Sequence, residues 1–373
     1  MRYLQLEECC EILDSLRIPI TASDRKAGPY PYYGANGIQD YVADYIFDDE
    51  LVLLAEDGGN FGSKTQPIAY RASGKFWVNN HAHVLKPKRN IVDVDYLCYS
   101  LMFYNTEELV NGATRQKLTQ AAMRKMLIPK QPIQVQEKIV AELKTIQAII
   151  SARQQQLQKL DELVKARFVE MFGDPVTNPM GWSEATIGDE CFYIKDGPHK
   201  SLPDIGKENG GHPFISVRNI VNGYIDFSSA RYISDEDYAD AIKKCHPEKG
   251  DMLYSKGGTT GIAKLIDIDE KFANWVHVAV LKFDKSKLNG IFFENMLNGA
   301  YCYEQSQRLT KGIANRDLVL SAMAQIQIYR PPIELQNQFA DFVTQADKSK
   351  AAIQKALDEA QLLFDSLMQK YFG

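Results

Sequence analysis

The C-terminal part of the chain repeats an earlier part at a distance of 200 residues. Between residues 112–173 and 312–373, 14 of 62 positions are identical without a gap, including Gly112 with Gly312, Pro132 with Pro332, Gln136 with Gln336 and Phe172 with Phe372. A fixed-period repeat of this length indicates a duplicated structural unit. The fold must therefore place two similar units in one chain of 373 residues.

Each repeat ends in a long amphipathic segment that begins after Pro132 or Pro332. Its apolar positions recur every three or four residues, at Ile139, Leu143, Ile146, Ile150, Leu157, Leu160, Val164, Phe168 and Met171, and at Phe339, Val343, Ala346, Ile353, Leu357, Ala360, Phe364, Leu367 and Tyr371. This period predicts two coiled-coil helices, each about 60 Å long. Because helix one must lead to the second domain and helix two must return, we expect them to pair antiparallel.

The segments before these helices consist mainly of short β-rich runs. Residues 51–55, 76–78, 83–85 and 276–281 are predicted strands, and residues 96–104 and 292–307 are predicted helices. The predicted fold class is α+β, with two β-rich domains at 1–131 and 174–331. A spacer helix follows each domain, at 132–173 and 332–373.

The charge pattern gives opposing indications about nucleic acid. The net charge of −5 argues against DNA binding, because DNA-binding domains are usually basic. However, no acid occurs between Asp57 and Asp93 or between Glu108 and Glu137, where lysines and arginines accumulate. Such blocks can produce a positive face on an acidic protein, or they can be solvated surface without a partner.

Catalytic motifs are missing from the sequence. The glycine-rich segments at 58–62 and 257–261 do not continue into the Gly-Lys-Ser/Thr of a phosphate-binding loop, and there is neither an HExxH motif nor an Asn-Pro-Pro-aromatic box. The six cysteines form no CxxC pair, so we expect reduced thiols and no metal site. Without a signal peptide or a long apolar run, the chain is expected to be a cytoplasmic protein and not an enzyme.

The glycine-rich loops and polar residues near the predicted strands are candidate DNA contacts. Gly58-Gly59-Asn60-Phe61-Gly62 is matched with Gly257-Gly258-Thr259-Thr260-Gly261, and His81 with His277. Glycines allow backbone to approach a DNA strand, although a tight turn explains them equally well. Asn and Arg side chains suit base edges, and Arg115, Lys117, Asn315 and Arg316 suit phosphates.

The full candidate set is distributed over both repeats. It contains Gly58, Gly59, Asn60, Lys64, Asn79, Asn80, His81, Arg115, Lys117, Ser216, Arg218, Asn219, Lys256, Gly257, Gly258, Thr259, Thr260, Asn274, Trp275, Asn315 and Arg316. For any one of these residues, a structural role in its loop remains an alternative.

The junction between the repeats resembles a known protein family. The segment Met171-Phe172-Gly173-Asp174-Pro175-Val176-Thr177-Asn178-Pro179-Met180-Gly181-Trp182, together with the Pro-Ile and Gln at the start of each helix, is similar to type I restriction-modification specificity subunits over essentially the whole chain. The resemblance implies two target-recognition domains that each bind half of a split duplex DNA site. It carries over no individual base-reading residue.

The same resemblance implies partner proteins. The conserved helices of such subunits hold the domains apart and dock two methyltransferase subunits, and motor-nuclease restriction subunits then join the complex. S-adenosylmethionine, ATP and Mg²⁺ are therefore expected in the partner subunits and not in this chain.

Two other functions remain open from the residues alone. A coiled-coil scaffold or adaptor without DNA binding would explain the acidic composition, but not the paired basic stretches. A self-contained methyltransferase or nuclease is disfavoured by the missing motifs.

Overall fold

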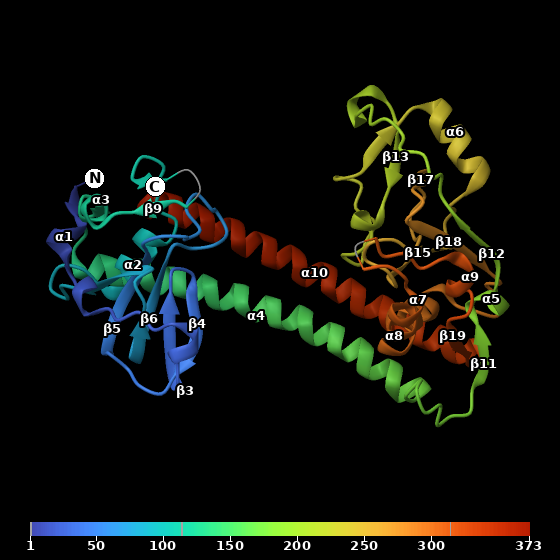
Figure 1. Ribbon diagram of the computed structural model, residues 1–373, viewed down its shortest axis with the longest axis horizontal. Coiled ribbons are helices and arrows are strands. Elements are labelled where there is room, and N and C mark those ends of the chain that lie inside the picture. The colour runs from blue at the N-terminus through green and yellow to red at the C-terminus, as the bar shows by residue number, and fades with distance from the viewer. Residues whose placement is uncertain (1, 113–114, 314) are drawn as a thin grey trace. The chain divides into compact units, whose positions relative to one another are not determined.

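The structure is a computed structural model that describes residues 2–112, 115–313 and 315–373 (Figure 1). The chain forms two compact units. Unit 1 contains Met1–Gln155 and Gln354–Gly373, and unit 2 contains Gln156–Ile353. Each unit combines β-sheets with segments of two long helices, which confirms the predicted α+β fold class.

Unit 1 is built on a six-stranded sheet. In spatial order its strands are β2 (Cys10–Ile12), β7 (Ala82–Pro87), β5 (Phe47–Ala55), β6 (Ala69–Val78), β3 (Ala27–Gly34) and β4 (Gly37–Val42). The β3–β6 pair is parallel and the other pairs are antiparallel. The predicted strands at 51–55, 76–78 and 83–85 lie in this sheet, and β5 is fully buried from Leu51 to Ala55.

Short elements surround the sheet of unit 1. They are β1 (Tyr3–Gln5), α1 (Leu6–Cys9), α2 (Val94–Met102), β8 (Val110–Asn111), β9 (Lys117–Leu118), α3 (Gln120–Arg124), β10 (Leu127–Pro129) and 3-10 turns at Asp14–Leu16 and Ala22–Asp24. β1 pairs with β10, and β8 pairs with β9. The helix predicted at 96–104 corresponds to α2, which packs against β5 and β6.

Unit 2 divides its strands among smaller sheets. One sheet has the order β12 (Cys191–Asp196), β18 (Val278–Phe283), β15 (Met252–Ser255) and β16 (Ala263–Leu265); a second has β14 (Arg231–Ile233), β13 (His212–Ile215) and β17 (Ala273–Asn274); and β11 (Ser183–Thr186) pairs with β19 (Gln327–Arg330). Its shorter helices are α5 (Ile187–Glu190), α6 (Asp235–Lys244), α7 (Gly290–Asn298), α8 (Ala300–Leu309) and α9 (Leu320–Met323), with 3-10 turns at Lys207–Asn209 and Val217–Asn219.

The helical prediction for residues 292–307 is confirmed except at Gly299, which separates α7 from α8. Gly299 has φ −67° and ψ 153°, so its backbone is extended and not helical. Its amide donates to the carbonyls of Asn295 and Met296 at 3.0 and 3.2 Å and closes α7. These angles are open to any residue, and α8 begins directly after Gly299.

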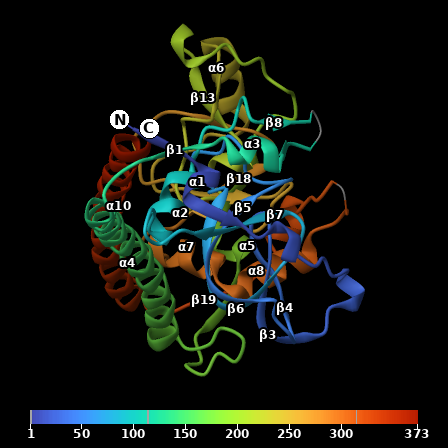
Figure 2. The same cartoon turned by 90° about the vertical axis from the view of Figure 1, so that its left-hand side faces the viewer.

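The two long helices are α4 (Ile133–Phe172) and α10 (Ile333–Phe372), as the repeat predicts. In unit 2 they run antiparallel: Asp161 lies 2.7 Å from Lys350, and Phe168 and Phe172 pack against Phe339 with ring centroids 5.4 and 5.5 Å apart. Figures 1 and 2 show the helices side by side. Seam positions such as Leu143 and Phe339 are fully buried, which confirms the 4-3 pattern.

A buried glutamine attaches the start of α4 to the preceding part of unit 1. The Oε1 atom of Gln136 accepts a hydrogen bond from the amide of Asp93 at 2.8 Å, and its Nε2 donates to the carbonyls of Ile91 and Gln131 at 3.0 and 2.8 Å. Asp93 is also the N-cap of α2 and accepts from the amides of Asp95 and Tyr96. The glutamine thus fixes the orientation of α2 against α4.

Unit 2 contains the same arrangement. Gln336 accepts from the amide of Asn289 at 2.9 Å and donates to the carbonyls of Lys287 and Pro331 at 3.2 and 2.7 Å. Asn289 is the N-cap of α7. The identity of Gln136 and Gln336 therefore reflects a shared hydrogen-bonding role.

None of the helices described here is long and apolar enough to cross a membrane. The cysteines, all six of which belong to the described residues, are buried and unpaired.

We expect Gln336→Ala to lower the free energy of unfolding by about 3 kcal/mol. The substitution removes three hydrogen bonds and leaves buried backbone groups without partners. Urea denaturation followed by circular dichroism measures the loss. Gln345→Ala, which changes an exposed glutamine on the same helix, is the control and is expected to have little effect. Equal losses in the two variants would contradict the proposed role of Gln336.

Candidate nucleic-acid interface

Three loops of unit 1 that are distant in sequence meet at one edge of its main sheet. They follow β5, β6 and β8. The amide of Glu56 donates to the carbonyl of His81 at 2.9 Å, and the carbonyl of Glu56 accepts from the amide of Leu118 at 2.7 Å. The amide of Gly58 donates to the carbonyl of Gln116 at 3.2 Å. These bonds bring together predicted site residues from three separate segments.

Unit 2 holds three loops with the same backbone bonds. The amide of Lys256 donates to the carbonyl of His277 at 2.8 Å, and the carbonyl of Lys256 accepts from the amide of Leu318 at 2.7 Å. The amide of Gly258 donates to the carbonyl of Arg316 at 3.1 Å. The two units therefore share one framework for this three-loop edge.

The shared bonds correct the sequence match between the glycine-rich loops. Gly58 occupies the position of Gly258 and not of Gly257, and the two glycines have similar φ angles of 62° and 67°. Gly257 instead occupies the position of Asp57, since each forms a β-bridge to the following hairpin. The sequence comparison placed this loop one residue out of register because it aligned the Gly-Gly pairs, whereas the backbone bonds keep the 200-residue distance of the C-terminal repeat.

The backbone bonds agree with the predicted match of His81 with His277. The amides of Asn79 and Trp275, two residues before these histidines, make the same bond, to the carbonyls of Tyr33 and Ile215 at 3.0 and 2.8 Å. Trp275 therefore corresponds to Asn79.

Five candidate residues are buried and hold their own loops. Two of them are asparagines that bond within their loops in unit 2: Asn219 accepts from the amide of Ser216, and Asn274 donates to the carbonyl of Val278. Lys256 bonds to Asp317, and Thr260 bonds to Thr310. In unit 1, Asn79 donates to Gln39 and accepts from the amide of His81. Their exposed fractions are 5% or less. These side chains are too deeply buried to contact DNA directly, and their role is to hold the loops in place.

The other candidates lie nearer the surface. Gly58, Lys64, Asn80, Arg115, Lys117, Arg218, Gly258, Thr259, Asn315 and Arg316 are exposed, whereas Gly59, Asn60, His81, Ser216 and Trp275 are half-buried and Gly257 is buried. A Cβ atom on Gly257 would lie 2.0 Å from Nδ1 of His277, so this glycine makes room for an imidazole ring.

The basic residues of unit 1 are largely neutralised by ion pairs. Arg115 lies 2.8 Å from Asp57, and Lys117 lies 3.0 Å from Glu56. Four further residues of the acid-free stretches pair with acids from other segments: Arg71 with Asp95, Lys86 with Asp49, Arg89 with Glu50 and Arg124 with Glu7. The acid-free stretches therefore give a weaker positive field than the sequence indicates.

Unit 2 contains a hollow of about 530 Å³ at its three-loop edge. It is lined by Ser216, Val217, Arg218, Gly257, Gly258, Trp275, His277, Asn315, Arg316 and Asp317. Seven of these residues belong to the predicted candidate set. Sequence reasoning missed Arg231, whose guanidinium lies 5.8 Å from the indole centroid of Trp275 and which lines an adjoining hollow. No motif near Arg231 could have identified it.

Comparison with known proteins identifies the family. The model of the type I restriction modification DNA specificity domain matches residues 1–162 and 179–361. The chain belongs to this family. The matches cover both units and confirm the predicted resemblance to type I specificity subunits.

Curated and solved relatives agree with this assignment. The chain is 28% identical over 379 residues to a putative type I restriction enzyme specificity subunit of Haemophilus influenzae. The aligned region covers 98% of this chain and 92% of the relative. It is 23% identical over 325 residues to the type I restriction enzyme MjaIX specificity subunit of Methanocaldococcus jannaschii, covering 82% and 74%. The crystal structure of a type I S subunit from M. genitalium shares the fold, with a TM-score of 0.64, 14% identity and coverage of 100% and 96%.

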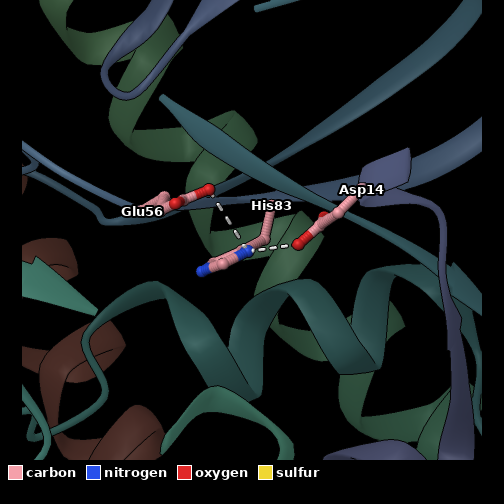
Figure 3. Close-up of side chains that lie close together, drawn as sticks. All are labelled: Asp14, Glu56 and His83. Carbon is pink, nitrogen blue, oxygen red and sulfur yellow. Dashed lines mark hydrogen bonds and ion pairs between the residues drawn. The ribbon is translucent and has the colours of Figure 1, made fainter. Parts of the chain in front are cut away.

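Below the three-loop edge of unit 1, this specificity subunit contains a cluster of Asp14, Glu56 and His83 (Figure 3). Nδ1 of His83 lies 2.7 Å from Oδ2 of Asp14, and Nε2 lies 2.9 Å from the carbonyl oxygen of Leu118. Both neighbouring atoms are acceptors, so the ring is placed to donate from both nitrogens. In that arrangement it offers no lone pair to a metal, and Glu56 is already bonded to Arg17.

The charged ring stabilises the carboxylate beside it. Burial raises the pKa of Asp14, but the hydrogen bonds and charge of His83, with bonds from Val84 and Gln120, outweigh burial and lower it below its usual range. In unit 2 the equivalent carboxylate, Asp196, faces Lys256 at 3.6 Å.

We expect His83→Ala to reduce the free energy of unfolding by about 3 kcal/mol at neutral pH, because it removes the 2.7 Å contact of the buried Asp14 carboxylate and leaves only the longer ion pair with Arg17 at 3.6 Å. Since the folded state lowers the pKa of Asp14, the stabilisation is present above the unfolded pKa of about 4 and is lost as pH falls through the folded value. The difference between variant and wild type should therefore shrink on acidification.

Urea unfolding between pH 7 and pH 3 measures this dependence. His246→Ala, at an exposed histidine, is the control. A Zn²⁺-dependent rise in wild-type stability that His83→Ala abolishes would show that the cluster binds metal instead.

Proposed function

We propose that this specificity subunit reads a bipartite duplex DNA target, with one half-site bound by the three-loop edge of each unit. The supporting observation is that one backbone framework carries different side chains in the two units. Asp57 and Arg115 of unit 1 correspond to Gly257 and Asn315 of unit 2. A common scaffold with divergent side chains suits the recognition of two different sequences by one protein.

The exposed candidates are the residues that we assign to DNA contact. Arg115, Lys117, Asn315 and Arg316 suit phosphates, and Asn80 suits a base edge. The buried candidates position the loops.

The chain itself is proposed to be non-catalytic. Methyl transfer and DNA cleavage belong to partner subunits, which would also hold S-adenosylmethionine, ATP and Mg²⁺. Action on DNA places the complex in the compartment that contains the chromosome, the cytoplasm of a prokaryotic cell.

The long helices offer equivalent sites for two methyltransferase subunits, and the motor-nuclease subunits would join that assembly. Leu163 on α4 and Leu363 on α10 are identical residues at repeat positions, with exposed fractions of 49% and 50%. Apolar side chains exposed at matched positions suit two copies of one partner.

Leu163→Asp and Leu363→Asp should each reduce the methyltransferase stoichiometry from two to one, and the double variant should bind none. A buried aspartate without a partner is costly at an apolar interface. Native mass spectrometry of complexes with the cognate methyltransferase measures the ratio. The control is Val176→Asp, at a residue that is 70% exposed and lies outside the helices. Two bound subunits in the double variant would refute these docking positions.

Exchange of residues 174–331 for the corresponding segment of a relative should change one half of the methylated site and leave the other half unaltered. Each unit has its own three-loop edge, so each unit recognises its half-site independently of the other. Methylation mapping in cells that contain the cognate partner subunits gives the target directly. A change in both halves would contradict independent reading, and an unchanged target would favour a scaffold that does not contact DNA.

A further inference from the structure

We propose that the hollow at the three-loop edge of unit 2 binds one phosphodiester group of the DNA backbone, and that unit 1 has no equivalent site. The proposal rests on the proposed function, because it assumes that this edge meets DNA. The bound group would be a backbone phosphate, it would lie in the hollow of unit 2, and the two units would differ in this contact.

The hollow presents a buried donor without an acceptor. Nε1 of Trp275 is buried and has no hydrogen-bond partner among the described residues, and the same is true of Nδ1 of His277. The two rings pack edge to face, with centroids 5.0 Å apart, and both line the hollow. An indole N–H can only donate, so the missing partner must be an acceptor.

The hollow is also positively charged. Arg218 and Arg316 line it, and Arg231 lies beside the indole of Trp275. Arg218 donates to the carbonyl of Ser229 at 2.7 Å, and Arg316 donates to the side-chain amide of Gln307, so both bonds are to neutral groups. None of the three arginines forms an ion pair within residues 2–112, 115–313 and 315–373.

The one acid that lines the hollow is already compensated. Asp317 lies 2.9 Å from Nζ of Lys256, which is itself buried. Asp204, whose pKa is lowered by backbone hydrogen bonds and in part by the charges of Arg231 and Arg218, lies outside the lining of the hollow. The site therefore combines unused donors with an excess of positive charge. An anion whose oxygens only accept hydrogen bonds satisfies both conditions.

The corresponding place in unit 1 is filled from within the protein. Nδ1 of His81 lies 2.6 Å from Oδ1 of Asp57, which also accepts from Arg115 at 2.8 Å. Unit 2 has Gly257 in place of Asp57, so its histidine loses this carboxylate partner. The His277 ring fills the space beside Gly257, so the hollow of unit 2 lacks the internal carboxylate that compensates Arg115 in unit 1.

A backbone phosphate fits the hollow better than a base edge. The edges of bases lie within a groove and present mixed donors and acceptors, whereas phosphates form the outer ridge of the duplex and present acceptors only. A concave site with donors alone is complementary to that ridge. Phosphate contacts set the position of a protein on DNA without reading sequence.

The test uses the assembled complex with its cognate methyltransferase and a duplex that carries its mapped target. We expect Arg218→Gln to weaken binding about tenfold for every sequence and to reduce the slope of log affinity against log salt by about one. Trp275→Phe should weaken binding about tenfold without changing the slope, because it removes a donor and no charge. The methylated sequence should stay the same in both variants.

Neutral methylphosphonate linkages, introduced one at a time, then locate the contact. At one position in the half-site of unit 2, the substitution should weaken binding to wild type but not to Arg218→Gln. Lys287→Gln, which removes an exposed charge beside Asp284 and outside the hollow, is the matched control and should keep the wild-type sensitivity.

Because Trp275→Phe also shrinks a ring, a second variant carries benzothienylalanine at position 275, in which sulfur replaces the indole N–H. The affinity of this sulfur variant for DNA should equal that of Trp275→Phe, and its thermal unfolding midpoint should equal that of the wild type. Wild-type affinity in Arg218→Gln and the sulfur variant, or an altered base preference, would overturn the phosphate site and leave bipartite recognition intact. Absence of site-specific binding by the wild-type complex would instead overturn the proposed function.

Discussion

The attachment of each long helix to its domain depends on one buried glutamine. Gln136 and Gln336 each use both ends of the side-chain amide to bind backbone groups next to the N-cap of a short helix. A rotation of the long helix about its axis would break all of these bonds. Since the helix cannot rotate, its apolar seam must face the partner helix, and the domain keeps a fixed orientation on it.

The helices were predictable because their information is local and ungapped. The apolar period and the Pro-Ile and glutamine at each start occur in both repeats at a constant distance, so neither helix required knowledge of distant contacts. The three-loop edges were predictable only in part. Their segments were recognised from glycines, histidines and asparagines, but the paired glycines were aligned one residue out of register, and the backbone hydrogen bonds were needed to equate Gly58 with Gly258.

Side-chain pairing explains most of what sequence reasoning did not anticipate. Arg71 finds its acids at Glu50 and Asp95, and Arg124 finds Glu7 at the other end of the domain. An acid-free stretch of sequence consequently gives a less positive surface than its composition indicates. Burial likewise makes side-chain amides unavailable to a partner. The amide of Asn274 could bond to a base edge, but it is buried in the protein and bonds to its own loop.

The two units use opposite charges at equivalent positions of this edge. Glu56 pairs with Lys117 in unit 1, whereas Lys256 pairs with Asp317 in unit 2. A hybrid domain made by a genetic crossover between these positions would place Glu56 against Asp317, or Lys256 against Lys117, and like charges in partly buried contact repel. Crossovers within the long helices keep both members of each pair on one side of the junction. Recombination is therefore expected to exchange whole domains. Under the proposed function, each such exchange replaces one complete half-site of the DNA target.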